Sequence, residues 1–311
     1  MTPANWNPQF IRVAANGINF EVATMGSGDR LALCLHGFPE HAYSWRHQMP
    51  LLARLGYRVW APNLRGYGNT DSPQEASAYK TRTLVEDVAA LIKASGAKET
   101  LLLAHDWGAA LAWSVAILQP QLIHRLVILN LPHPALFARE LRRPPQLLMS
   151  WYMYFFQLPW LPEKMLGRNH GRATSGIFRR TSRNPARFPA EDLEVYRANA
   201  ARPGGLTAMI NWYRAAFRGG TFRRFRSGDI PVINIPTLFL WGDADTALSI
   251  RATRGTEKYV SNLTFRIFPG VSHWIQQEAP EAVNAMLEAW LSGEPVPEYE
   301  QLRLPAAKAE S

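Results

Sequence analysis

Short apolar runs bounded by turn residues recur near both ends of this 311-residue chain. The runs are 31–35, 57–61, 101–103 and 126–129 in the first part and 236–241 in the second, where residues 263–268 are also predicted to form a strand. Runs of this length without alternation are typical of strands buried on both faces, and amphipathic stretches such as 45–56, 84–95 and 280–291 have helical spacing. Apolar and polar residues alternate on both sides of Asn16-Gly17, which predicts a β-hairpin. The order of elements predicts an α/β fold with a mostly parallel, doubly wound sheet.

The pattern changes between residues 135 and 228, where buried β-branched runs are absent and the chain becomes helical, arginine-rich and aromatic. We therefore expect residues 1–134 to form the first part of an α/β core. Residues 135–228 are expected to form an inserted helical cap (lid) domain, and residues 229–311 the second part of the core. The polar, proline-containing tail from residue 293 onward is expected to be extended or frayed.

Charge is concentrated in the predicted cap. The formal net charge is +9, and the stretch 139–226 holds 16 arginines and one lysine against five acids. A basic patch of this kind suits nucleic acid or an anionic surface. The chain has no P-loop, no zinc-ligand spacing and no helix-turn-helix pattern, so a solvated basic face is favoured. We expect no nucleic-acid partner and no metal.

The remaining composition favours an intracellular protein. Cys34 is the one cysteine, and it lies inside an apolar run, so an intrachain disulfide is impossible and the thiol is expected to be buried. The N-terminus lacks the basic and apolar regions of a signal peptide. No run of about 18 apolar residues is present, so no membrane span is expected. These features predict a cytoplasmic protein.

The stretch 100–117 carries the strongest chemical signal. A buried strand leads into Ala104-His105-Asp106-Trp107-Gly108 and then into a helix rich in alanine, the context of a nucleophile elbow. Small residues at 104 and 108 prevent clashes where strand and helix cross. A carboxylate at the elbow is kept ionised by the helix dipole and nearby N–H groups, and an ionised carboxylate attacks an sp3 carbon without a base. An ordinary helix-capping role for Asp106 explains this stretch equally well by itself.

Other strand ends carry residues that complete a catalytic site. Gly37 follows the run 31–35 and lets the backbone of Phe38 present an N–H group, which would face an oxyanion together with the N–H of Trp107. An acid at Asp243 or Asp245 and then His273 each follow a later strand. The order nucleophile, acid, histidine is that of the α/β-hydrolase triad. A lone histidine after a strand is more often structural, but three residues in this order indicate a site.

Over nearly its whole length the chain resembles the epoxide hydrolases of the α/β-hydrolase fold. The motifs that carry the resemblance are His36-Gly37-Phe38-Pro39-Glu40, His105-Asp106-Trp107-Gly108, Trp241-Gly242-Asp243-Ala244-Asp245, Gly270-Val271-Ser272-His273-Trp274, Tyr152-Met153-Tyr154-Phe155-Phe156-Gln157 and Asn211-Trp212-Tyr213-Arg214. The resemblance implies that Asp245, rather than Asp243, is the acid. It also implies that Tyr152 and Tyr213 are the two lid tyrosines, with Tyr154 as an alternative to Tyr152.

The resemblance implies hydrolysis of epoxides to vicinal diols without a cofactor. Asp106 would form an alkyl ester that is hydrolysed by water activated by His273 and Asp245. Phe38, Pro39, Trp107 and Tyr154 are expected to contact substrate. The apolar, aromatic cap indicates a small hydrophobic or aromatic epoxide as the partner, bound by a monomer or homodimer.

Two alternatives stay open. A haloalkane or haloacetate dehalogenase of the same fold would share the nucleophile and the histidine, but a halide needs indole or amide N–H donors where an epoxide needs phenols. A non-catalytic protein that binds a small molecule between cap and core is the second alternative, and a complete set of nucleophile, acid and base argues against it.

Overall fold

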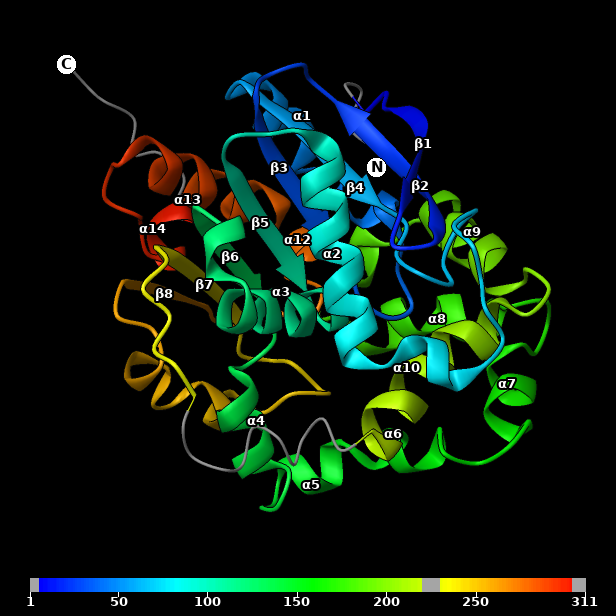
Figure 1. The fold of residues 1–311 in the computed structure, drawn as a ribbon. Coiled ribbons are helices and arrows are strands. Elements are labelled where there is room, and N and C mark those ends of the chain that lie inside the picture. The colour runs from blue at the N-terminus through cyan, green and yellow to red at the C-terminus, as the bar shows by residue number, and fades with distance from the viewer. Residues whose placement is uncertain (1–5, 220–229, 304–311) are drawn as a thin grey trace.

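The structure, a computed structural model, describes residues 6–219 and 230–303. Its centre is one eight-stranded sheet with the order β1-β2-β4-β3-β5-β6-β7-β8 (Figure 1). The pairs β1–β2 and β2–β4 are antiparallel, and all other neighbouring strands of the sheet are parallel. The strands are β1 (Gln9–Ala15), β2 (Ile18–Met25), β3 (Arg30–Leu35), β4 (Tyr57–Pro62), β5 (Thr100–His105), β6 (Arg125–Leu129), β7 (Thr237–Gly242) and β8 (Leu263–Phe268). The predicted α/β class, the hairpin at Asn16-Gly17 and the parallel strands are confirmed.

Helices cover both faces of the sheet, which explains the uninterrupted apolar runs. In β3, Leu33 and Leu35 join the core under α2 (Thr81–Ser95) and α3 (Trp107–Leu118). The neighbouring Cys34 points to the opposite core, under α1 (Met49–Arg54) and α13 (Pro280–Ser292). Because successive strand residues face opposite sides, a strand between two helical layers must be apolar at every position.

Helices of the middle segment lie between β6 and β7 in the chain, and in Figure 1 they lie beyond the arrowhead of β5. We call residues 134–218, from α4 to α10, the helical insertion. Its helices are α4 (Pro134–Glu140), α5 (Gln146–Met149), α6 (Trp151–Phe155), α7 (Leu161–Leu166), α8 (Arg172–Thr181), α9 (Ala190–Ala200) and α10 (Gly205–Arg218). The domain boundary expected at residue 228 lies outside the described residues.

Two local predictions were wrong. The amphipathic stretch 45–56 forms the short helix α1 after a 3-10 turn over Ala42–Trp45, so it is not one continuous helix. The tail is not frayed up to residue 303, because α14 (Tyr299–Arg303) follows α12 (Ile275–Glu278) and α13 and docks on the core. Tyr299 is buried and packs on Phe268 at a centroid distance of 4.7 Å, so one aromatic contact anchors this segment.

No helix in residues 6–219 or 230–303 combines the length and apolar character that crossing a membrane requires.

A buried ion pair joins the helical insertion to the core. Arg46, after the 3-10 turn, contacts the Asp192 carboxylate of α9 at 2.7 Å, and both side chains are fully buried. The Tyr43 hydroxyl donates to the other oxygen of Asp192 at 2.6 Å, and Arg46 also donates to Gln277 at 2.7 Å. A buried pair of this kind is sensitive to the loss of one partner, because the remaining charge stays in a low-dielectric site.

We therefore predict that Arg46→Met lowers the free energy of unfolding by about 3–5 kcal/mol, because the Asp192 carboxylate loses its buried counter-charge. Urea denaturation measures the change. Arg54→Met is the matched control, since Arg54 pairs with Glu288 at the exposed surface and its loss should leave the midpoint unchanged. Equal midpoints for the two variants would contradict this role of Arg46.

Candidate active site

Asp106 stands at a strained turn between β5 and α3. Its backbone has φ 49° and ψ −121°, and its side chain makes no capping hydrogen bond to the helix that follows. The helix-cap explanation of this residue is therefore not realised. A Cβ on Gly108 would lie 2.2 Å from the Leu35 carbonyl oxygen, so the elbow needs glycine there. A Cβ on Gly37 would lie 2.4 Å from the Asp106 Cβ, so the loop after β3 can approach the elbow only as glycine.

The two oxygens of Asp106 have different surroundings. Oδ1 accepts a hydrogen bond from the Phe38 backbone N–H at 2.7 Å. Oδ2 lies 3.7 Å from His273 Nε2. Burial by itself raises the pKa of Asp106, but the hydrogen bond and charge of His273, together with the Phe38 N–H, outweigh it and hold the pKa below its usual value. Asp106 is thus an ionised carboxylate with one oxygen anchored by the backbone.

His273 is oriented by Asp245 from the loop after β7. His273 Nδ1 and Asp245 Oδ2 are 2.6 Å apart. Burial lowers the pKa of His273, but the charges of Asp245 and Asp106 more than compensate, so its pKa is raised. Asp243 is exposed and accepts the Gly270 N–H at 2.7 Å, so Asp245 is the carboxylate of this loop that contacts His273.

Asn130, at the end of β6, supports Asp245 and was not predicted as a site residue. Its side-chain amide donates to Asp245 Oδ2 at 2.8 Å, while its oxygen accepts the Gly242 N–H at 2.9 Å. The Ala247 and Leu248 N–H groups donate to Asp245 Oδ1 at 2.7 and 2.9 Å. The backbone of Asn130 has φ 42°, a left-handed conformation that asparagine tolerates better than most residues. The sequence signal that could have identified Asn130 is its position directly after a buried strand.

A second network lies behind the elbow and was also missed. The His105 ring contacts the Glu40 carboxylate at 2.8 Å through Nδ1 and the His273 carbonyl oxygen at 2.9 Å through Nε2. Glu40 is fully buried and also accepts from Gln276, Gln277 and the Gly37 N–H. This network ties the loops that carry Phe38, Asp106 and His273 to one another.

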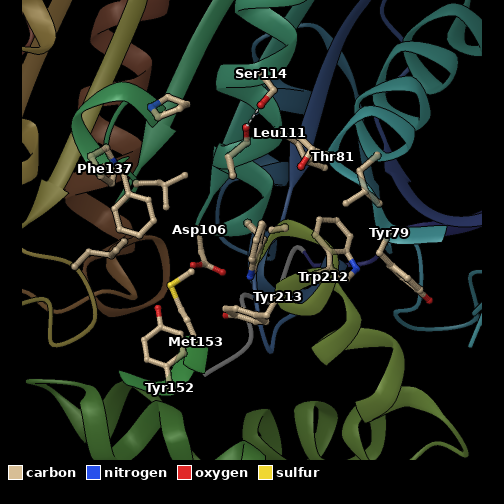
Figure 2. Close-up of a pocket in the computed structure, with 18 residues that line it drawn as sticks. Tyr79, Thr81, Asp106, Leu111, Ser114, Phe137, Tyr152, Met153, Trp212 and Tyr213 are labelled. Carbon is tan, nitrogen blue, oxygen red and sulfur yellow. Dashed lines mark hydrogen bonds between the residues drawn. The ribbon is translucent and has the colours of Figure 1, made fainter. Parts of the chain in front are cut away.

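A largely apolar cavity opens in front of Asp106 (Figure 2). Trp107 lines it from the core, Tyr152 and Met153 from α6, and Trp212 and Tyr213 from α10. Figure 2 shows the hydroxyl groups of Tyr152 and Tyr213 directed toward the Asp106 carboxylate. Burial and the nearby Asp106 charge raise the pKa of both phenols, so both keep their protons near neutral pH. Two proton donors therefore face one carboxylate.

The structure does not bring all expected residues to the cavity. Tyr154 is 51% exposed and packs on Phe217 of α10, so its expected substrate contact is wrong, and Tyr152 occupies that place. Phe38 and Pro39 are buried but do not line this cavity, and the Phe38 ring packs on Tyr213 at 5.3 Å. On this short helix Tyr152 and Met153 face the cavity while Trp151 and Tyr154 are exposed, a difference that the sequence pattern did not resolve. Within the described residues, no group of three or more His, Cys, Asp or Glu side chains forms a metal site.

The family profile described as "alpha/beta hydrolase fold" matches residues 33–280. The chain therefore belongs to the α/β-hydrolase-fold family, as the sheet order and the elbow indicate.

Individual relatives narrow this assignment. Epoxide hydrolase 4 of Homo sapiens is 37% identical over 292 residues, covering 92% of this chain and 79% of that protein. The AB hydrolase superfamily protein YfhM of Bacillus subtilis is 36% identical over 284 residues, covering 91% and 97%. The crystal structure of an epoxide hydrolase from Bacillus megaterium with an inhibitor has a TM-score of 0.82 at 30% identity, covering 91% of this chain and 100% of that chain. Within its family, the chain belongs to the epoxide hydrolases.

We predict that Asp245→Asn lowers the pKa of His273, because the raising effect of the Asp245 charge is lost while burial, which lowers the pKa, remains. An NMR titration of the His273 ring measures the shift. Asp243→Asn removes an exposed carboxylate of the same loop and should leave the titration unchanged. A shift in the Asp243 variant of equal size would contradict the assignment of Asp245.

Proposed function

We propose that this protein hydrolyses epoxides to vicinal diols through a covalent ester on Asp106. The observation that carries the proposal is an ionised carboxylate at the elbow that faces two protonated phenols across an apolar cavity. Membership of the epoxide hydrolases supports it. We also propose that residues 135–228 act as the cap domain that closes the cavity, and that the substrate is a small hydrophobic or aromatic epoxide.

In the first step, Asp106 Oδ2 attacks an epoxide carbon, and the C–O bond on that carbon breaks. The opposing oxygen leaves well only if it receives a proton, and Tyr152 or Tyr213 donates it. The product is a hydroxyalkyl ester of Asp106. Oδ1 stays on the Phe38 N–H during this step, so Oδ2 is the oxygen available for attack.

In the second step, His273 Nε2 takes a proton from water, and the resulting hydroxide attacks the ester carbonyl carbon. Negative charge then develops on Oδ1, where the Phe38 N–H already lies at 2.7 Å. We propose the Trp107 N–H as the second donor to this oxyanion. Before this step, the proton that His273 carries in the free enzyme passes through solvent to the phenolate left by the first step. Collapse of the intermediate releases the diol, whose departing oxygen takes the proton of the added hydroxyl group. Asp106 is then ionised and His273 protonated, as at the start of the cycle.

Ester formation also prepares His273 for its task. In the free enzyme the Asp106 charge helps to hold a proton on His273. The ester is neutral, so this contribution disappears and the pKa of His273 falls. The histidine is therefore converted into a base only after the first step has occurred.

The indole of Trp107 lines the cavity and could serve a halide as well as an epoxide, so the two phenols favour epoxide hydrolysis over the dehalogenase alternative. The Trp212 indole N–H, which would be one donor for a halide, is already engaged by the Arg65 carbonyl oxygen at 3.1 Å. The groups that face Asp106 are phenols, which suit a leaving oxygen that needs a proton.

A single turnover in ¹⁸O-labelled water tests the proposed function. Excess enzyme is mixed with styrene oxide, and mass spectrometry locates the label. We expect ¹⁸O in the peptide containing Asp106 and none in the diol, because water attacks the ester carbonyl. Asp106→Asn is the control and should show neither diol nor label. Label in the diol of the first turnover would overturn the covalent route, and the absence of any diol would overturn epoxide hydrolysis.

Removal of either phenol should slow ester formation. We predict that Tyr152→Phe and Tyr213→Phe each lower the rate of this step by ~10²-fold, at the lower end for loss of a general acid. Stopped-flow tryptophan fluorescence measures the rate. Tyr154→Phe changes an exposed phenol on the same helix and should have no effect. If all three variants react alike, the proton-donor assignment fails.

The two steps should differ in their response to pH. Ester formation needs ionised Asp106, whose lowered pKa makes the rate constant flat from about pH 5 upward. Ester hydrolysis needs neutral His273, so its rate constant should rise with pH until the lowered pKa of the ester state is passed. Single-turnover kinetics from pH 5 to 9 separate the steps. A hydrolysis rate that falls as pH rises would exclude His273 as the base.

A further inference from the structure

Several large apolar side chains on the helical insertion are exposed. Leu148, Trp151 and Trp160 are 69%, 64% and 66% exposed. Tyr154, Leu158 and Phe217 are also exposed, and the Tyr154 ring packs edge-on against Phe217. We call these six residues the insertion patch. In Figure 1 the helices α5, α6 and α7, which carry or flank most of it, follow one edge of the molecule. Soluble surfaces rarely gather apolar side chains in this way without a binding function.

The patch and the cavity share one helix. Tyr152 and Met153 of α6 line the cavity, while Trp151 and Tyr154 of the same helix face outward. Whatever contacts the outer side of α6 therefore lies one helix thickness from the proposed active site.

The backbone conformation of Trp160 indicates that the exposure of its indole ring has a function. This residue precedes α7 with φ 50°, a left-handed conformation that a bulky L-residue rarely adopts. Its indole is nevertheless exposed, with the Lys164 ammonium 6.0 Å from the ring centroid. A strained residue that holds an aromatic ring in solvent is expected where the ring has a partner.

The positive charge around the insertion patch indicates which kind of partner binds it. Between residues 134 and 190 the sequence has ten basic residues and only two acids, Glu140 and Glu163. Both acids are already paired with arginine, Glu140 with Arg139 and Glu163 with Arg214. Basic side chains on the segments that carry the patch are exposed, among them Arg142, Lys164 and Arg218. The patch is therefore apolar and aromatic with a positive rim.

We propose that the insertion patch docks on the surface of an anionic lipid bilayer. Tryptophan and tyrosine favour the boundary between headgroups and acyl chains, and basic residues beside them are attracted to anionic headgroups. A second copy of the chain is a poorer occupant, because a two-fold interface would bring the same basic rims together. The docked protein presents its α6 side to the bilayer, and a lipophilic epoxide dissolved there lies close to the cavity.

Vesicle flotation of the full chain tests the proposal. The probes are vesicles of phosphatidylcholine alone and of phosphatidylcholine with about 30% phosphatidylserine, without any epoxide. We expect binding to the anionic vesicles, at least tenfold weaker binding to the neutral ones, and release by 0.5 M salt, because screening weakens attraction between exposed charges. The double variant Trp151→Ser/Trp160→Asn should bind anionic vesicles at least tenfold more weakly, and Arg142→Gln/Lys164→Gln should lose most of the salt-sensitive binding.

Matched controls separate docking from folding defects. Phe10→Ser removes an apolar side chain that is 59% exposed on β1, and Lys93→Gln/Lys98→Gln removes two exposed charges near α2. Both should bind as the unaltered protein does. All variants should keep its circular dichroism spectrum and melting temperature. Since no substrate is present, the result is independent of the proposed epoxide hydrolysis.

Three outcomes would overturn the proposal. The first outcome would be that the unaltered protein fails to bind anionic vesicles. The second would be that the tryptophan variant binds them as well as the Phe10 control does. In the third, size-exclusion chromatography shows a dimer that the tryptophan variant converts to monomer, which would assign the patch to a contact between two copies.

Discussion

The chemistry of this protein depends on a close approach between two backbone segments. The loop after β3 reaches the elbow after β5 only because Gly37 has no Cβ, which would lie 2.4 Å from the Asp106 Cβ. That approach brings the Phe38 N–H to 2.7 Å from Asp106 Oδ1. The contact stabilises the carboxylate in the free enzyme and, in the proposed mechanism, receives the oxyanion later. One short contact therefore distinguishes the two oxygens of Asp106 and, in the proposed mechanism, gives each a separate role.

The charges of Asp106 and Asp245 set the basicity of His273. Two carboxylates flank one imidazole, so the imidazole holds its proton more tightly than usual while both are ionised. In the proposed reaction, esterification of Asp106 removes one of these charges. The site therefore changes the basicity of His273 by its own chemistry, without movement of the chain. Asn130 and two backbone N–H groups keep Asp245 in place through this change.

Buried polar contacts hold the helical insertion above the strand ends. The Arg46–Asp192 pair joins α9 to the core, and the Trp212 indole donates to the Arg65 carbonyl oxygen from α10. The second contact also satisfies the Trp212 indole N–H, so this group is already engaged beside the cavity. The insertion thus has an inner side, where phenols face Asp106, and an outer side, where apolar and basic residues face solvent.

The sequence by itself determined the parts that depend on local pattern. A run that is apolar at every position predicts a strand covered on both faces. The small residues Ala104 and Gly108 on either side of Asp106 predict a tight strand-to-helix turn. The order of Asp106, Asp245 and His273 predicted residues that the structure brings together, although Asp243 stayed open as the acid until its exposure was known. Only the tertiary structure decided which of the neighbouring tyrosines 152 and 154 faces the cavity. It also revealed Asn130, Glu40 and His105, because hydrogen bonds between distant loops leave no periodic signal along a chain.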